Sequence, residues 1–203
     1  MTPRRSLILA LPALAGCSVL PDRPYQEVRR YALAPERPRR EPPRPGGKVL
    51  LIRTFRAAPG LDTRGLRSIG RDGQVTQEYW EEWSAPPAEL AEEATRRWLG
   101  NAGLFAAVTA PGSRLRADLV LEGELTRLQA EPDAGQARAG LSVLLLTERN
   151  GGPARILATL LPEGSAPLPS RDGAAAAAAM SAALGTALTA LETALRRELA
   201  RRA

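Results

Sequence analysis

Residues 118–128 read DLVLEGELTRL, and apolar and polar side chains alternate along them. Leu119, Leu121 and Leu125 fall on one face of an extended chain, and most of the charged residues fall on the other. This pattern is typical of a strand with one face in the core and the other in water. Gly123 lies on the apolar face and predicts a bulge at that position.

Two later segments extend the same pattern. Residues 139–147 alternate in the same way. Asn150-Gly151 then favours a two-residue hairpin turn, which leads to a third strand near 156–160. The three segments together predict an antiparallel meander.

The segments before residue 118 predict further strands. Residues 49–52 (VLLI) form a continuous apolar run, which is typical of a central strand buried on both faces. Strands near 66–69 and 74–83 are joined by Asp72-Gly73, a strong hairpin signal. Residues 104–108 predict a short strand at an edge of the sheet.

Two helices complete the predicted domain. The first opens at Ser84-Ala85-Pro86-Pro87 and stops at the glycines of 100–103. The second covers about 172–201, where leucines recur at helical spacing and polar residues argue against a membrane span. We therefore predict an α+β fold over residues 48–203: a single, mostly antiparallel or mixed sheet with two helices packed on it.

The N-terminal residues predict a secretory signal. Arg4-Arg5 precede a short apolar run, and Leu14-Ala15-Gly16-Cys17 resembles a bacterial lipobox. Residues 1–16 would then be removed and Cys17 would be acylated, tying the chain to a membrane. The alternative is a plain signal peptide with a chance cysteine, but Cys17 is the only cysteine in the chain.

Residues 17–47 predict a tether. Proline is frequent here and favours an extended chain, which would span roughly 90 Å at ~3.1 Å per residue. Tyr31-Ala32-Leu33 leaves an alternative open, because this stretch could pair as a short strand or dock on the domain.

The composition excludes several kinds of chemistry. The chain of 203 residues has no histidine, so Ser-His-Asp, Cys-His and histidine metal sites are absent, and a lone cysteine forms no internal disulfide. We expect no cofactor and no metal.

The net charge of +6 comes mostly from arginines spread along the chain, which suits lipid headgroups better than nucleic acid. Glu122 and Glu124 share a strand face and are expected to be solvated surface charges.

Three aromatic residues cluster before the first helix: Tyr79, Trp80 and Trp83. On a regular strand Tyr79 and Trp83 share one face and Trp80 takes the other. Either both faces lie in the core, or one of them is an interface for a partner.

The order of these features resembles the ABC-type transport auxiliary lipoprotein family, which includes the lipoprotein of the Pqi intermembrane transport system. The matching pieces are LAGC at 14–17, YAL at 31–33, VLLI at 49–52, AAPGLD at 57–62, Tyr79 with WSAPP at 83–87, Leu99, GLF at 103–105, Val108, ADLVLEG at 117–123 and the alanine-rich terminal helix.

The resemblance implies a non-catalytic role. Such proteins work with an inner-membrane ABC transporter and an MCE-domain protein that carries lipids or other hydrophobic molecules between membranes. They are anchored at the periplasmic face of the outer membrane, and Ser18 after Cys17 fits that sorting. Some relatives form homo-oligomeric rings that dock on the MCE assembly. The alternative readings are a lipoprotein that regulates cell-wall synthesis and, third, an enzyme acting on lipid or glycan.

Overall fold

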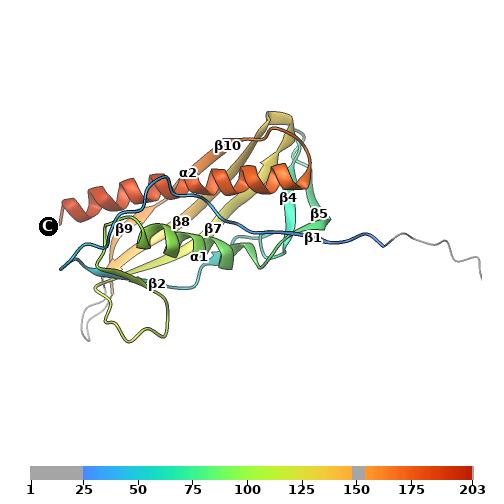
Figure 1. Cartoon of the computed structure of the whole chain (residues 1–203). Coiled ribbons are helices and arrows are strands. Elements are labelled where there is room, and N and C mark those ends of the chain that lie inside the picture. The colour runs from blue at the N-terminus through green and yellow to red at the C-terminus, as the bar shows by residue number, and fades with distance from the viewer. Residues whose placement is uncertain (1–24, 148–153, 203) are drawn as a thin grey trace, which may run out of the picture.

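The computed structural model describes residues 25–147 and 154–202. A ten-stranded mixed sheet carries both helices on one face (Figure 1). The elements in chain order are β1 (Arg29–Tyr31), β2 (Val49–Ile52), β3 (Arg56–Ala57), β4 (Gly65–Ile69), β5 (Val75–Trp83), α1 (Pro87–Gly100), β6 (Ala107–Thr109), β7 (Leu119–Glu131), the 3-10 turn Pro132–Ala134, β8 (Gln136–Thr147), β9 (Arg155–Leu160), β10 (Glu163–Pro167) and α2 (Gly173–Ala200).

Strand β7 organises the sheet, because both of its edges are used along its length. One edge pairs with β8 in antiparallel fashion, and the other edge pairs in parallel with β2, β3 and β4 in turn. Strand β6 flanks β2, while β5 and then β1 flank β4. The far edge of β8 is shared by β9 and β10. The predicted α+β class, the meander of β7, β8 and β9 and the β4–β5 hairpin are therefore confirmed, whereas the Asn150-Gly151 turn lies outside the described residues.

The core lies between the sheet and the helices. The leucines of β7 that face it are Leu119, Leu121, Leu125 and Leu128. The last two are three residues apart and still share a face, because the β7–β8 register shifts between Leu125 and Arg127. The bulge is therefore here and not at Gly123, where it was predicted. Gly123 pairs regularly, and a Cβ at that position would come within 2.3 Å of the Phe55 ring.

Strand β2 is central, as predicted, but only one of its faces is core. Leu50 and Ile52 are fully buried, whereas Val49 and Leu51 are half-buried. In the described part of the chain both helices lie on the other face of the sheet, which explains the difference.

Helix α2 packs as a core element. Leu184, Leu188, Leu191 and Leu195 are fully buried. Asp172 caps the helix by accepting a hydrogen bond from the Ala175 N–H at 2.9 Å. Among the described residues α2 is the one helix long and apolar enough to cross a bilayer. Its leucines pack in the core against the sheet, as the sequence predicted.

Strand β10 was not predicted, and it brings Gly164 against α2. A Cβ at Gly164 would lie 2.2 Å from the Ala183 carbonyl oxygen and 2.4 Å from the Ala187 nitrogen. We expect Gly164→Ala to lower the free energy of unfolding by about 1–3 kcal/mol, because backbone on both sides must move. Urea denaturation measures this. Gly100→Ala is the control, since a Cβ there meets nothing within 4 Å, and an equal loss in both variants would contradict the account.

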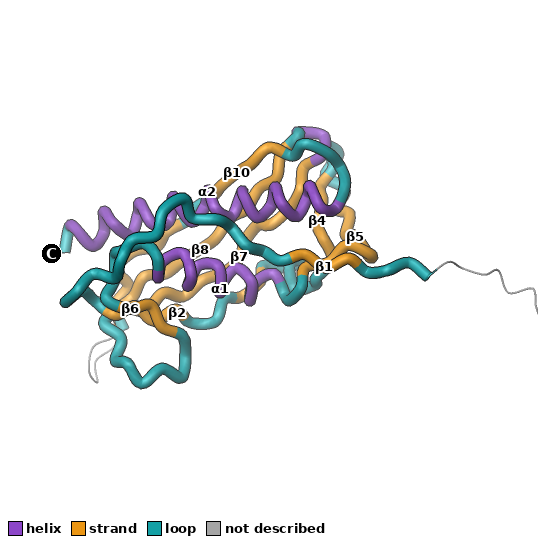
Figure 2. The backbone as a smooth tube through the Cα atoms, viewed as in Figure 1, coloured by secondary structure: helices purple, strands orange, loops and turns teal. Residues whose placement is uncertain are grey.

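The N-terminal segment differs most from expectation. Residues 29–47, assigned to the free tether, pack on the domain instead. Strand β1 pairs in parallel with β5, which confirms the alternative reading of Tyr31-Ala32-Leu33, and Leu33 is buried. Residues 33–47, here called the strap, then cross the helix face of the molecule (Figure 2). Proline-rich composition predicted no packing because it disfavours regular hydrogen bonding, but it does not prevent docking through side chains.

A candidate anchor and contact surface

A partly buried ion-pair network holds the strap to the helices. The Arg37 guanidinium donates to both carboxylate oxygens of Glu192 in α2, at 3.2 and 3.0 Å. The same carboxylate accepts the Trp98 indole N–H of α1 at 2.9 Å and the Arg196 guanidinium at 3.1 Å. The side chains of Arg37 and Glu192 are only 11% and 13% exposed. One carboxylate therefore joins the strap, α1 and α2.

Backbone contacts continue the docking beyond Arg37. The Glu41 N–H donates to the Asn101 carbonyl at 2.8 Å, and the Arg44 N–H donates to the Phe105 carbonyl at 3.0 Å. Gly103 lies under this part of the strap with a positive φ of 64°, and a Cβ there would meet the Glu41 side chain at 2.8 Å. The strap is thus fixed at both of its ends.

The charges in this network set the pKa of Glu192. Burial of the carboxyl group raises its pKa, but hydrogen bonds from Arg37, Trp98 and Arg196 outweigh burial and hold the pKa below its ordinary value of 4.5. A carboxyl group with a lowered folded-state pKa stabilises the fold fully above its unfolded pKa. That stabilisation is lost as the pH falls through the folded-state pKa.

We therefore expect an acid-dependent loss of stability that Glu192→Gln removes in part. Melting temperatures measured from about pH 7 down to about pH 3 should fall more steeply below about pH 4.5 in the parent than in the variant. The amide cannot titrate, whereas the carboxylate loses its hold on Arg37 when it is protonated. Parallel curves for the two proteins would contradict the assigned role.

The packing of β1 and the strap limits how far Cys17 can lie from the domain. The first residue paired in the sheet is Arg29, and Cys17 itself lies outside the described residues. Arg29 lies twelve positions after Cys17, so the two residues are at most about 40 Å apart. The first described residues lie at the end of the molecule where β1, β4 and β5 lie, and α2 ends at the opposite end (Figure 1).

The three clustered aromatic residues separate into a core residue and an exposed pair. Trp83 is 1% exposed and belongs to the core, so of the three possible interface residues it is the one that the structure removes. Tyr79 and Trp80 are 76% and 38% exposed, and their rings pack edge to face with centroids 4.8 Å apart. An exposed aromatic pair of this kind is a candidate contact surface.

A wide bulge in β5 explains why Tyr79 and Trp83 do not share an environment. Gly65 of β4 lies opposite Glu82, but Arg67 already lies opposite Gln77. Four residues of β5, 78–81, therefore lie opposite Leu66 alone, and the strict alternation of faces on which the sequence prediction depended is broken.

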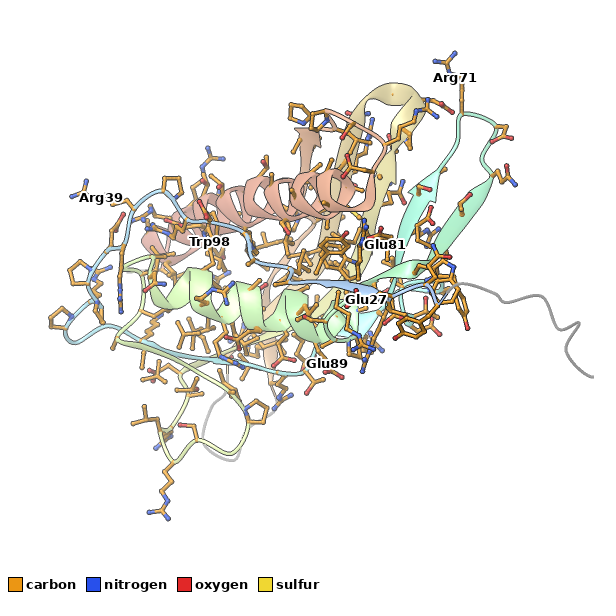
Figure 3. The ribbon with its side chains drawn as sticks, turned by 45° about the vertical axis from the view of Figure 1, so that its right-hand side comes forward. Glu27, Arg39, Arg71, Glu81, Glu89 and Trp98 are labelled. Atoms are coloured by element: carbon orange, nitrogen blue, oxygen red, sulfur yellow. The ribbon has the colours of Figure 1, made fainter. Side chains whose placement is uncertain are left out.

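The rest of the β4–β5 hairpin is braced against the body. Arg71 lies at its tip (Figure 3), and the Arg71 backbone N–H donates to the Asp133 carboxylate at 3.1 Å. Arg171 donates to the same carboxylate at 2.9 Å. The hydrogen bond from the Arg71 backbone, followed by the one from Arg171, lowers the pKa of Asp133. The hairpin thus presents its bulge from a fixed position.

The carboxylates on the open face of the sheet are ion-paired. Glu122 accepts from Arg53 at 2.6 Å, and Glu124 lies 3.9 Å from Arg56. Both carboxylates line an open hollow of about 640 Å³. They are surface charges, as the sequence predicted. Within 25–147 and 154–202, no group of three or more aspartate, glutamate, cysteine or histidine side chains is placed to hold a metal ion.

Comparison with known protein families identifies the family of this chain. The model of the ABC-type transport auxiliary lipoprotein component matches residues 31–192, which run from β1 through the strap and the sheet to Glu192. The chain therefore belongs to the ABC-type transport auxiliary lipoprotein family. A comparison with curated proteins finds no match.

Two solved structures share the fold, with TM-scores above 0.5. Protein XCC0632 from Xanthomonas campestris, of family DUF330, is 24% identical with a TM-score of 0.69, covering 86% of this chain and 98% of that one. An uncharacterised protein is 12% identical with a TM-score of 0.64, covering 83% and 99%. PelC from Paraburkholderia phytofirmans, solved as a dodecamer, is 15% identical with a TM-score of 0.40, covering 73% and 93%.

Proposed function

We propose that this chain is the non-catalytic lipoprotein component of an ABC/MCE-type intermembrane transport system. In this role it is acylated at Cys17 and held at the periplasmic face of the outer membrane. It docks on a periplasmic MCE-domain protein, and the system carries lipids or other hydrophobic molecules. The observation that carries the proposal is the family match over residues 31–192. This range includes the strap, most of the sheet and Glu192, whose ion pair with Arg37, here called the latch, joins the strap to the helices.

The side chains support a role in binding more than one in catalysis. The charged residues that lie close together are engaged in structural ion pairs, as in the Arg37–Glu192 latch and the Glu122–Arg53 pair. The chain contains no histidine, and acylation would consume its only cysteine. A cysteine that carries several acyl chains gives a stable membrane anchor, whereas one acyl chain holds a protein at the membrane only marginally.

The family resemblance also implies that copies assemble into a homo-oligomeric ring. A ring would repeat the same contact surface around a closed circle. The mass of the purified mature chain in mild detergent tests this, and a mass equal to one chain at all concentrations would contradict it.

Partner identification tests the proposed function. The mature protein is crosslinked in its own cells, purified from the membranes and analysed by mass spectrometry. We expect an MCE-domain protein together with the permease and ATPase of an ABC transporter. Recovery of a cell-wall synthase without any MCE protein would overturn the proposal in favour of wall regulation. An unrelated outer-membrane lipoprotein from the same cells, treated identically, controls for non-specific capture.

A further inference from the structure

The exposed aromatic pair lies where the anchored chain leaves the domain. The first pairs of the β1–β5 ladder join Arg29 to Glu81 and Arg30 to Glu82. Tyr79 and Trp80 directly precede this ladder in β5. Tyr25, four residues before Arg29, is 91% exposed. Three exposed aromatic side chains thus belong to the two segments that meet at the exit point.

The anchor keeps this end of the molecule close to the membrane. Tyr25 lies eight positions after Cys17, within about 28 Å of it, and Arg29, the first residue fixed in the ladder, lies within about 40 Å. The bulge with Tyr79 and Trp80 is fixed to β1 by the β1–β5 ladder and to the body by the braced hairpin. The length of the segment 17–29 therefore limits how far this bulge can lie from the anchor. The opposite end of the molecule, with the C-terminus of α2, points away from the exit (Figure 1).

The chemistry of the surface suits a lipid headgroup layer. Tyrosine and tryptophan are enriched at membrane interfaces, where an apolar ring and a polar tip are both satisfied. Arg29 lies 3.5 Å from Glu81, and Arg30 lies 3.5 Å from Glu82, so charge of both signs is present. The exposed carboxylates of Glu27 and Glu78 favour a surface of low net charge over a strongly anionic one.

We propose that Tyr79 and Trp80, with Tyr25, rest in the headgroup layer of the membrane that holds the anchor. The domain then stands on its β1–β5 end and presents its far end to the periplasm. This inference rests on the proposed anchoring at Cys17, and it names the surface that orients the anchored domain.

Attachment through Cys17 in vitro allows a test that does not depend on acylation or transport in cells. The mature chain, residues 17–203, has a single thiol, which can be coupled to a maleimide lipid in vesicles rich in phosphatidylethanolamine. Brominated acyl chains in the same vesicles quench nearby tryptophan. The contribution of Trp80 is the difference between the parent protein and Trp80→Phe, because Trp83 and Trp98 are buried in both. We expect the Trp80 emission to shift to shorter wavelength and to lose intensity on coupling.

A tryptophan placed elsewhere is the matched control. The loop between β6 and β7 lies away from the β1–β5 end of the molecule (Figure 1), and Leu115 within this loop is exposed. In the Trp80→Phe background, Leu115→Trp should stay unquenched. Trp80 emission that is unchanged by coupling would overturn the inference, as would equal quenching of both reporters. A concentration-dependent shift of Trp80 emission without vesicles would assign the surface to a second copy and would also overturn it. Absence of lipid on Cys17 in cells would overturn the proposed anchor and leave these outcomes unaffected.

Discussion

Replacing Trp83 by alanine is expected to lower the free energy of unfolding by about 3–5 kcal/mol. The side chain is 1% exposed at the junction of β1 and β5. Its backbone N–H donates to the Arg64 carbonyl at 2.8 Å, which holds the strand in place. Removing the indole ring therefore leaves a cavity in the core. Guanidinium denaturation of the variant and the parent gives the difference directly.

Trp80→Ala is the matched control for this prediction. Trp80 is 38% exposed on the bulge, and its loss is expected to cost less than about 1 kcal/mol. Equal losses for the two variants would return both tryptophans to the core and remove the candidate contact surface.

Replacing Glu192 by alanine is expected to have the second-largest effect, a loss of about 2–4 kcal/mol. Breaking a buried ion pair costs about 3–5 kcal/mol, and the remaining exposure of this pair reduces the figure. The Trp98 N–H would lose its acceptor, and Arg37, whose Nη1 atom already lacks a hydrogen-bond partner, would keep only the longer contact with Glu41 at 3.4 Å. Trypsin cleavage after Arg39 or Arg40 should become faster, because the strap is released before the sheet unfolds.

Glu163→Ala provides the comparison for Glu192→Ala. Glu163 pairs with Arg127 at 3.3 Å on an exposed surface, and such pairs contribute about 0–1 kcal/mol. If Glu192→Ala costs no more than Glu163→Ala, or leaves trypsin cleavage unchanged, the latch does not hold the strap.

The sequence predicted the repeating parts of the fold, because their signals are local. Alternation in β7 and β8, the Asp72-Gly73 turn and the leucine spacing of α2 each depend on neighbours in the chain. Short strands carry too few residues to show a period. Strand β3 has two residues, and β10 contains a glycine and a proline that both argue against a strand.

The candidate site was predicted only in part, because its decisive contacts are long-range. Arg37 and Glu192 are 155 positions apart, and nothing in the composition of the strap marks Arg37 among its neighbouring arginines. The aromatic cluster was found from its composition. Its division into a core residue and an exposed pair depends on the wide bulge opposite Gly65, which no local pattern indicates.

The docked strap also changes what the proposed anchor at Cys17 would do. A tether of 17–47 would let the domain reach far from the membrane, whereas a segment that ends at β1 would hold one end of the domain near it. Deleting residues 34–46 is therefore expected to remove the Arg37–Glu192 latch and to destabilise the domain.

The acyl state and location of Cys17 test the proposed role of this protein. We expect the mature protein to begin at a lipid-modified Cys17 in mass spectrometry and to fractionate with membranes, while Cys17→Ala is released into the soluble fraction. A Cys17→Ala protein that stays with the membranes, or a mature chain whose Cys17 carries no lipid, would contradict it.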